Sequence, residues 1–426
     1  MPGAGNPQYI DADKLCVGLF IELDLDWVEH PFPFNRFRIK TPEQLQALQA
    51  LGLKRVRVDP GRSSCPLPAA RTSASRAQEA EPAELSEESE AHAAHEVNQA
   101  KMERLARIKA HHQAIDECEK AFRTAAKDMR SIQLNIYAQP EESIERASAM
   151  VKNLIQTSIN DRQVTISLVN NKLASGEVYD HAMNVMVLGL VIGQQLGLQG
   201  EDLQALGLGC IFHDLGKTLI SNSITHKFPP LSPHEQRALN QHVPLGVEVG
   251  GRIGLEPAVL QIIAEHHERA DGSGFPNKLK DEAICMGARI VCVVNDFDNL
   301  CNPLNPMLAM NPHEALKLMY AKRRKEYSPI VISQFIRCMG IYPPGTLVAL
   351  NNGTQGVVVA VNTEQPLKPT VMVYDGSVPR RDAIVLDLSE EADVAIESAL
   401  SKSALSLEVV SYLNPRSRSS YFTQAQ

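Results

Sequence analysis

Five histidines and one aspartate between residues 181 and 267 constrain this chain more than any other feature of its sequence. Four of these six residues stand as adjacent pairs, in the segments F-H-D-L-G-K and H-H-E-R-A-D-G-S-G-F-P. Imidazole and carboxylate groups together suit Fe, Mn, Zn or Ni, whereas an all-oxygen set would favour Mg or Ca. The pattern therefore predicts a multinuclear metal site made by His181, His213, Asp214, His242, His266 and His267.

A structural explanation competes with this prediction at each histidine taken singly. A lone buried histidine is usually a hydrogen-bonded core residue, and an isolated His-Asp pair carries little information. The joint pattern differs, because a His-His pair beside a glycine-rich D-G-S-G-F-P loop is difficult to explain by packing. The remaining histidines are assigned to linker or surface, with no metal role: His30, His92, His95, His111, His112, His226, His234 and His313.

Helical spacing adds two residues to the site. Lys217 follows Asp214 by three positions and shares its helical face, where a cation suits a substrate phosphate beside the metals. Glu177 precedes His181 by four positions and offers a further carboxylate on that face. The adjacent side chains of His213 and Asp214 diverge by about 100° on a helix. They either serve neighbouring metals, or the carboxylate bridges two metals while the imidazole binds one.

Composition excludes several classes of protein. A formal net charge of -8 argues against a dominant surface for a nucleic-acid polymer, but it is compatible with a small anionic ligand. The eight cysteines form no C-x-x-C pair, which fits a reducing cytoplasm better than a disulfide framework. The N-terminus has no signal-peptide pattern. The longest apolar stretch, 185–192, is too short to span a bilayer, so we expect a buried helix and no transmembrane segment.

The chain divides into five predicted regions. Residues 1–60 have the mixed strand and helix pattern of a small module, and residues 61–95 form an acidic, flexible linker of Ala, Ser, Glu and Pro. Residues 96–130 are charged and helical, and a dimer through this connecting helix is one expectation. Long amphipathic helical patterns dominate residues 131–340. Residues 341–426 form a β-rich extension and tail, with a hairpin signal at Asn352-Gly353. The expected fold is mainly α, with an N-terminal α+β module and a C-terminal β-rich subdomain.

The histidine pattern and its flanking segments resemble one family. The order of these residues is similar to that of the HD-GYP family, a branch of the HD-domain metal phosphohydrolases. In this chain the order reads H181, H213-D214-x-x-K217, H242, H266-H267-E268, D271-G-x-G274-F275-P276. The resemblance covers about residues 135–340, and its compound motif is highly specific. The N-terminal module resembles a small domain that precedes HD-GYP in one bacterial subgroup, where segments such as D-N-L-C-N-P and Y-P-P-G-T recur.

This resemblance implies an all-α HD-type catalytic domain that holds two or three divalent metals, most often Fe or Mn, with Zn, Ni and Mg as alternatives. It also implies hydrolysis of the bacterial second messenger cyclic di-GMP to pGpG and in some members to GMP, in a cytoplasmic signalling system that controls biofilm formation and motility. The family's loop, here Gly274-Phe275-Pro276, shapes the site and contacts signalling proteins. With Asp271 and Gly272, it supplies the expected substrate-binding residues.

Three departures from the family pattern set the open questions. Asn295 stands where the family has a metal-ligating aspartate, and Asp296 would point about 100° away from that position on a helix. Phe275 replaces a tyrosine, which keeps the ring and loses a hydroxyl. The segment L-N-P-M at 304–307 lacks the family's phosphate-binding arginines, for which Arg269 and Lys278 are candidate replacements.

The sequence therefore predicts an active metal-dependent cyclic di-GMP phosphodiesterase. The expected catalytic residues are Asp214 and Lys217, and the expected metal ligands are Glu177, His181, His213, Asp214, His242, His266, His267 and Asn295. The main alternative is a degenerate HD-GYP domain that binds cyclic di-GMP or partner proteins with little turnover, for which Asn295 is the chief argument. A hydrolase of another phosphorylated nucleotide is a third hypothesis, which the G-F-P loop disfavours.

Overall fold

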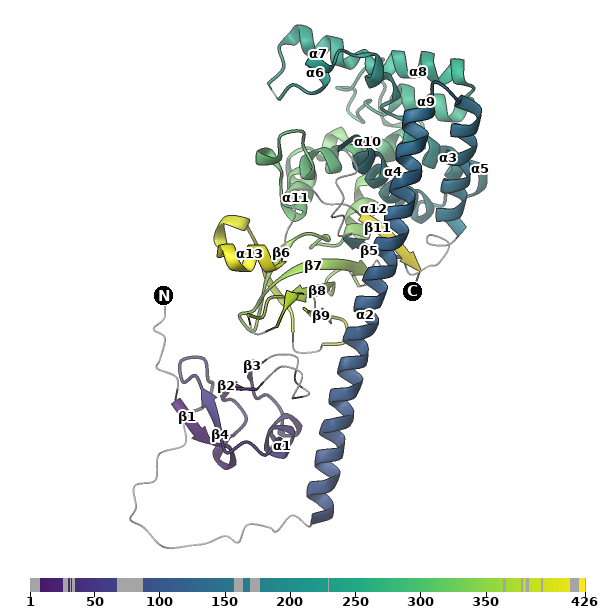
Figure 1. Ribbon diagram of the computed structural model, residues 1–426. Helices are drawn as coiled ribbons and strands as arrows, with labels where there is room; N and C mark the ends of the chain where they lie inside the picture. The colour runs from purple at the N-terminus through teal and green to yellow at the C-terminus, as the bar shows by residue number, and fades with distance from the viewer. Residues whose placement is uncertain are drawn as a thin grey trace, which may run out of the picture. The chain divides into compact units, whose positions relative to one another are not determined.

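A computed structural model of the chain describes residues 8–25, 30, 32, 35–66, 87–156, 164–168, 177–228, 230–362, 365–376, 378–380, 383–391, 394–413 and 421–425 (Figure 1). The chain divides into two compact units. One contains Met1–His112 with Asn351–Thr354 and Asp375–Leu386, and the other contains Gln113–Leu350, Gln355–Tyr374 and Asp387–Gln426. Each unit is described by itself.

The N-terminal unit contains a small α+β module, as the sequence predicts. Its antiparallel sheet has the order β1 (Gln8–Asp11), β4 (Arg55–Val58), β2 (Phe20–Glu22) and β3 (Arg36–Arg38). Helix α1 (Pro42–Ala50) begins with a capping hydrogen bond from the Gln44 amide to the Thr41 hydroxyl. His30 is buried in this module beside Asn35 and is not a surface residue, contrary to its predicted assignment.

Helix α2 (Glu87–Asn135) begins inside the stretch predicted to be a linker. The physical reason is composition: Glu87 and the glutamates after it favour a helix N-terminus, and the following alanines are strong helix formers. Residues 67–86 of that predicted linker lie outside what the structure describes, as do the side chains of His92, His95, His111 and His112.

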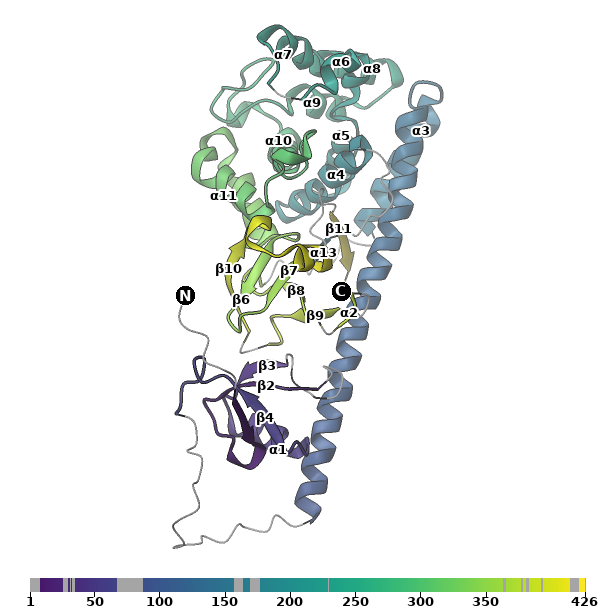
Figure 2. The same ribbon diagram turned by 60° about the vertical axis from the view of Figure 1, so that its left-hand side comes forward.

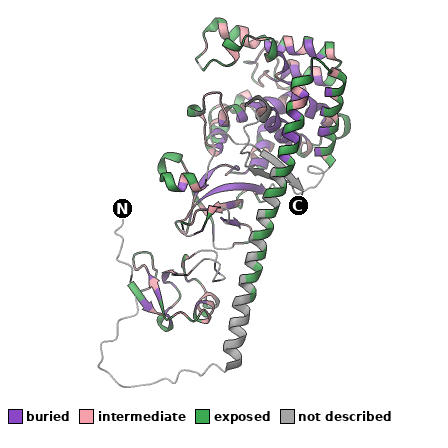
Figure 3. Cartoon of the chain, viewed as in Figure 1, coloured by how far each residue is buried: buried purple, intermediate pink, exposed green. Residues whose placement is uncertain are grey.

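The helical region of the second unit holds most of the hydrophobic core (Figure 3). Helix α4 (Glu177–Gln195) is buried on all sides over 185–192, as predicted for the longest apolar stretch. Within the described ranges, no helix combines the length and apolarity that a bilayer crossing requires. The other main helices are α3 (Pro140–Leu154), α5 (Gly200–Phe212), α8 (His242–Ile253), α9 (Pro257–Glu265), α10 (Met286–Cys301), α11 (Pro312–Lys322) and α12 (Pro329–Met339).

Glycines allow the helices around α5 to approach closely. A Cβ atom on Gly207 would lie 2.5 Å from Val151 on α3, and one on Gly209 would lie 2.6 Å from Ile262 on α9. Short elements connect α5 to α8: the 3-10 helix η4 (Leu215–Leu219), α6 (Asn222–Thr225) and α7 (Pro233–Asn240). A Cβ atom on Gly216 would lie 2.0 Å from the His242 carbonyl oxygen, so only glycine lets η4 pack against α8.

The C-terminal strands form the predicted hairpin and recruit a strand from elsewhere. Strands β6 (Leu347–Leu350) and β7 (Gln355–Asn362) flank the Asn352-Gly353 turn, where Gly353 has φ +85°. The sheet order is β10 (Ile396–Leu400), β6, β7, β5 (Val164–Leu168) and β11 (Tyr421–Ala425), and β8 (Thr370–Val373) also pairs with β7 (Figures 1 and 2). Strand β9 (Ile384–Asp387) and helix α13 (Leu407–Leu413) complete this region.

Strand β5 was not predicted. It belongs to the segment assigned to the catalytic domain, so the sheet does not stop at the predicted boundary at residue 340.

Candidate metal centre

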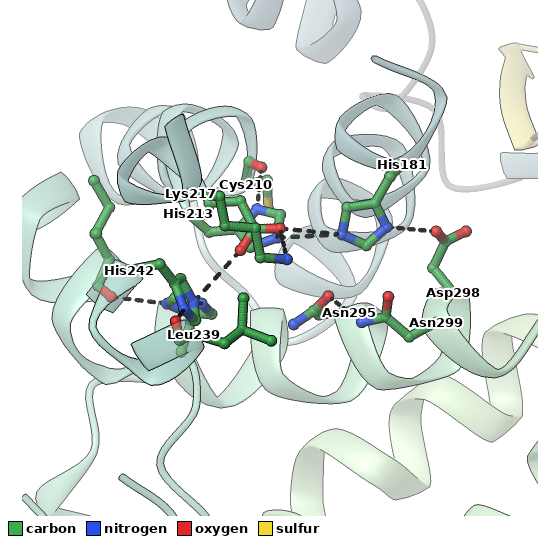
Figure 4. Close-up of polar contacts among 12 residues, drawn as sticks. His181, Cys210, His213, Lys217, Leu239, His242, Asn295, Asp298 and Asn299 are labelled. Carbon is green, nitrogen blue, oxygen red and sulfur yellow. Dashed lines mark hydrogen bonds and ion pairs between the residues drawn. The ribbon is translucent and has the colours of Figure 1, made fainter. Parts of the chain in front are cut away.

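The predicted histidines and aspartate converge from four helices and the turns that follow them. Figure 4 labels His181, His213 and His242 among them. His181 lies on α4, His213 and Asp214 follow α5, His242 begins α8, and His266 and His267 follow α9. Their possible ligand atoms form two groups that share Asp214, and within each group these atoms lie within 4.8 Å of one another. One group is His181, His213 and Asp214, and the other is Asp214, His242, His266 and His267.

The Asp214 carboxylate faces both groups. Its Oδ2 atom lies 3.3 Å from His213 Nε2 and 3.8 Å from His181 Nε2. Its Oδ1 atom lies 3.5 Å from His242 Nε2. This is the placement expected of a carboxylate that bridges two cations, which was one of the two arrangements that the sequence left open.

Local hydrogen bonds fix which ring nitrogen of three histidines faces the site. Each Nδ1 atom donates to the carbonyl three residues earlier: His213 to Cys210 at 2.8 Å, His242 to Leu239 at 2.7 Å and His266 to Ile263 at 2.7 Å. Because a carbonyl oxygen can only accept, each of these Nδ1 atoms carries the proton. In a neutral imidazole the other ring nitrogen, Nε2, then keeps its lone pair.

Two observations indicate that cations fit between these groups. The Nε2 atoms of His181 and His213 are 3.3 Å apart, and those of His242 and His266 are 3.4 Å apart. In the second pair both nitrogens present lone pairs, which repel unless something positive lies near them. The Oδ1 atom of Asp214 is buried and has no hydrogen-bond partner, an expensive state that a divalent ion would relieve.

The protonation states suit metal ligation. Burial, together with neighbouring histidines, holds the pKa values of His266 and His267 well below the ordinary value, and burial also lowers the pKa of His242. Burial acts to raise the pKa of Asp214, but the charges of Lys217 and His213 outweigh it and hold that pKa well below normal. Near neutral pH these imidazoles are therefore neutral and the carboxylate is ionised, the forms that bind metals.

Lys217 and the buried Asp298 flank the group that contains His181. Lys217 Nζ donates to Asp214 Oδ2 at 2.6 Å, which confirms the shared face inferred from spacing. Asp298 is completely buried, and its Oδ2 atom accepts from His181 Nδ1 at 2.6 Å while Oδ1 accepts from Asn184 at 2.7 Å. No role was predicted for Asp298, although its position three residues after Asn295 in N-D-F-D-N-L was the available signal.

Asn295 and Asp296 point in different directions from α10. Asn295 is buried, and its Oδ1 atom accepts from Asn299 Nδ2 at 2.8 Å (Figure 4). Asp296 instead accepts hydrogen bonds from Arg269, Arg323 and Tyr327. The geometry agrees with the expectation that Asp296 points away from the position of Asn295 on the helix. The side chain of Glu177 lies outside the described side chains, so its predicted ligand role stays a prediction.

The glycine-rich loop after His267 packs against the centre. The ring of Phe275 stacks on His267, with centroids 4.7 Å apart and planes inclined by 19°. A Cβ atom on Gly274 would lie 2.5 Å from the His267 carbonyl oxygen, so this glycine permits the close approach. Glu268 accepts from the amides of Asn277 and Leu279 at 2.6 and 2.9 Å, and exposed Asp271 accepts from Ser273. These contacts organise the loop itself.

A cavity of about 650 Å³ opens beside His181, His213, Asp214 and Lys217. Of the expected substrate-binding residues, Lys217 lines it, whereas Arg269, Asp271, Gly272, Gly274, Phe275 and Pro276 do not. Arg269 is largely buried in an ion pair with Asp296, and its phosphate-binding role stays a prediction. Lining residues that sequence reasoning missed come from distant segments: Gln133, Asn222, Thr225 and His226. His226, assigned to linker or surface with no metal role, is exposed and also lines this cavity.

Comparison with known proteins adds three matched families. An HD domain model matches residues 159–331, a KOW domain associated with HD domains matches 347–408, and a domain of unknown function, DUF3391, matches 8–147. A cyclic di-GMP phosphodiesterase of Pseudomonas aeruginosa is 27% identical over 86% of this chain and 84% of its own length.

Two further relatives match shorter stretches. The cyclic di-GMP phosphodiesterase response regulator RpfG of Xanthomonas campestris pv. campestris is 29% identical over 52% of this chain and 61% of its own. A 3'3'-cGAMP-specific phosphodiesterase of Vibrio cholerae is 31% identical over 34% of this chain and 29% of its own.

Proposed function

Because the chain belongs to the HD-GYP family, with a DUF3391 module before the HD domain and an HD-associated KOW domain after it, we propose that it is a metal-dependent phosphodiesterase that hydrolyses cyclic di-GMP. The expected product is pGpG, with GMP as a possible second product. The observation that carries the proposal is the Asp214 carboxylate, which faces two histidine groups at the edge of a cavity.

The donor sets define the proposed metal ligands. His181, His213 and Asp214 would hold one ion, and Asp214, His242, His266 and His267 would hold a second. Glu177 and Asn295 are proposed for a third position. A mixed imidazole and carboxylate set favours Fe or Mn over Mg, and Zn or Ni remains compatible with it. When bound, such ions stabilise the charge of an attacked phosphodiester and lower the pKa of water.

The protein groups around the donors have separate tasks. Lys217 is 39% exposed and faces the cavity, so its ammonium can bind a non-bridging phosphate oxygen while still contacting Asp214. Asp298 holds the His181 ring through Nδ1, which keeps Nε2 directed at the centre. The cavity volume lies in the range of small-molecule sites, which suits a cyclic dinucleotide.

The degenerate alternative depends on Asn295, and the two donor groups do not need that residue. Four further predictions accompany the proposal: partner binding at the Gly274-Phe275-Pro276 loop, homodimerisation, a bacterial cytoplasmic setting, and control of biofilm formation and motility. Pro276 is exposed at that loop and is accessible to a partner.

The decisive experiment is anaerobic incubation of the full-length protein, loaded with Fe(II) or Mn(II), with cyclic di-GMP and, in parallel, with 3'3'-cGAMP. Chromatography should show metal-dependent pGpG or GMP from cyclic di-GMP. The protein with both His213 and Asp214 changed to alanine should have neither bound metal nor turnover. Bound but intact cyclic di-GMP in metal-loaded protein would support the degenerate alternative, and faster hydrolysis of 3'3'-cGAMP would change the assigned substrate.

A further inference from the structure

A buried cluster of charges lies next to the metal centre without contributing a proposed ligand. At its middle, the Asp296 carboxylate is only 14% exposed and accepts from Arg323 at 2.8 Å, from the Tyr327 hydroxyl at 2.9 Å and from Arg269. Tyr327 is 1% exposed, and both guanidinium groups lie 5.5 Å from its ring centroid. Arg323 also pairs with Glu326 at 2.8 Å, and Arg269 lies 3.7 Å from the same carboxylate.

The cluster joins two segments that carry proposed metal ligands. Asp296 directly follows Asn295 on α10, and Arg269 stands two residues after His267. A backbone hydrogen bond of 2.9 Å from Ala270 to the Glu326 carbonyl holds the same segment from its other side. The turn after α9 is therefore fixed to α10 and to residues 323–327 by charge-assisted and backbone hydrogen bonds.

Loss of the central carboxylate would have an effect beyond this cluster. Without Asp296, Arg269 and Arg323 would share the Glu326 carboxylate, which lies 2.8 Å from Arg323 and 3.7 Å from Arg269, so two partly buried cations would be left with one anion. Arg269 has the longer contact with Glu326, so it would lose most of its compensating charge, and it stands two residues after His267. Metal affinity depends on ligand placement to within fractions of an ångström, so a shift there would reach the His242, His266 and His267 group.

We propose that Asp296 is a positioning residue for the metal centre: through Arg269 it holds the His266-His267 pair at the separation from His242 and Asp214 that a metal requires. Asp296 touches neither substrate nor metal. This inference rests on the proposed metal centre, but not on the identity of the nucleotide substrate.

The test is a titration of metal-free full-length protein with Mn(II) alone, with free Mn(II) followed by its electron paramagnetic resonance signal. Asp296→Asn should weaken Mn(II) binding by about 10- to 100-fold, the range seen when groups that hold metal ligands are changed. Tyr327→Phe removes one donor and keeps the ring, so it should weaken binding by less than about tenfold. Glu142→Gln, which breaks the exposed Glu142–Arg146 pair on α3, is the matched control and should bind as wild type.

Thermal unfolding of each metal-free variant separates positioning from simple stability. Folded Asp296→Asn protein that binds Mn(II) as tightly as wild type, and loses only thermal stability, would overturn the inference. If Asp296→Asn does not fold, Tyr327→Phe and Arg323→Gln decide the question: weaker binding by either supports the inference, and unchanged binding by both overturns it. Absence of Mn(II) binding by wild type would overturn the metal centre as well. Normal Mn(II) binding without nucleotide hydrolysis would overturn only the substrate.

Discussion

The two donor groups that share Asp214 are built differently. The group with His181 borders the cavity, and polar side chains hold two of its members: His181 is 17% exposed and contacts Asp298, while Asp214 contacts Lys217. Its third member, His213, is 1% exposed and donates to the Cys210 carbonyl. In the other group, His242 and His266 are 2% and 1% exposed, and the Phe275 ring covers His267. Imidazole and carboxylate donors thus line a cavity in the group with His181 and lie in the protein core in the group with His242. We expect the cavity-side ion to contact substrate and to exchange faster with solvent.

Replacement of the shared carboxylate should have the largest effect, because it removes a ligand from both groups at once. Asp214→Asn keeps the shape and loses the charge, and we expect metal loss from both groups and a decrease in turnover of about 1,000-fold or more. Elemental analysis of the purified protein and the cyclic di-GMP assay measure the two quantities. Full metal content in this variant would show that Asp214 does not join the groups.

The next change addresses the cavity side alone. Asp298→Asn takes away the carboxylate that accepts from His181 Nδ1, so metal affinity of the cavity-side group should fall by about 10- to 100-fold while the other group stays loaded. Metal content at limiting Mn(II) should then fall by one ion per chain. Asp202→Asn, an exposed carboxylate at the start of α5, is the matched control. Equal loss from both groups would contradict their independence.

A smaller effect is expected on the buried side. Phe275→Leu removes the ring that stacks on His267, a contact of about 0.5–1.5 kcal/mol, so metal affinity of that group should fall by about two- to tenfold. Phe275→Tyr keeps the ring and should bind metal as wild type does. Isothermal titration with Mn(II) distinguishes the two variants. If the leucine variant matched wild type, the loop would not support the metal ligand.

The smallest effect should come from Asn295→Asp, which adds a charge beside groups that already have their donors. Asn299 can donate to the new carboxylate as it now does to the amide oxygen. We expect metal occupancy and rate to rise by less than about tenfold, measured by elemental analysis and initial velocity. No change in either would mean that another ligand already fills this position.

Local patterns predicted the centre because its geometry is largely local. His213, His242 and His266 each use the carbonyl three residues earlier, so a histidine at the end or start of a helix is oriented by its own backbone. The Asp214–Lys217 contact likewise follows from spacing within one turn. The continuous apolar run at 185–192 located the buried stretch of α4, because a helix without a polar face is buried on all sides.

The features that the sequence did not predict depend on distant partners. Arg269 reads as an exposed cation until Asp296 is placed against it by the packing of α10. His226 and Gln133 line the cavity only because α6 and the end of α2 meet there. The V-T-I-S-L segment of β5 does not show by itself that it pairs with β7, because pairing between strands so far apart in the sequence leaves no local signal.

Strand β5 also has a consequence for how the protein is made. Thr165 pairs with Asn362, and Leu168 pairs with Tyr421, so both neighbours of β5 are synthesised long after it. During translation the ribosome releases β5, then the whole run from α4 to α12, before either neighbour exists. The helices can assemble while this strand still has two open edges, which are templates for pairing with other chains. Nascent chains of this protein should therefore depend on chaperones until both β7 and β11 have emerged.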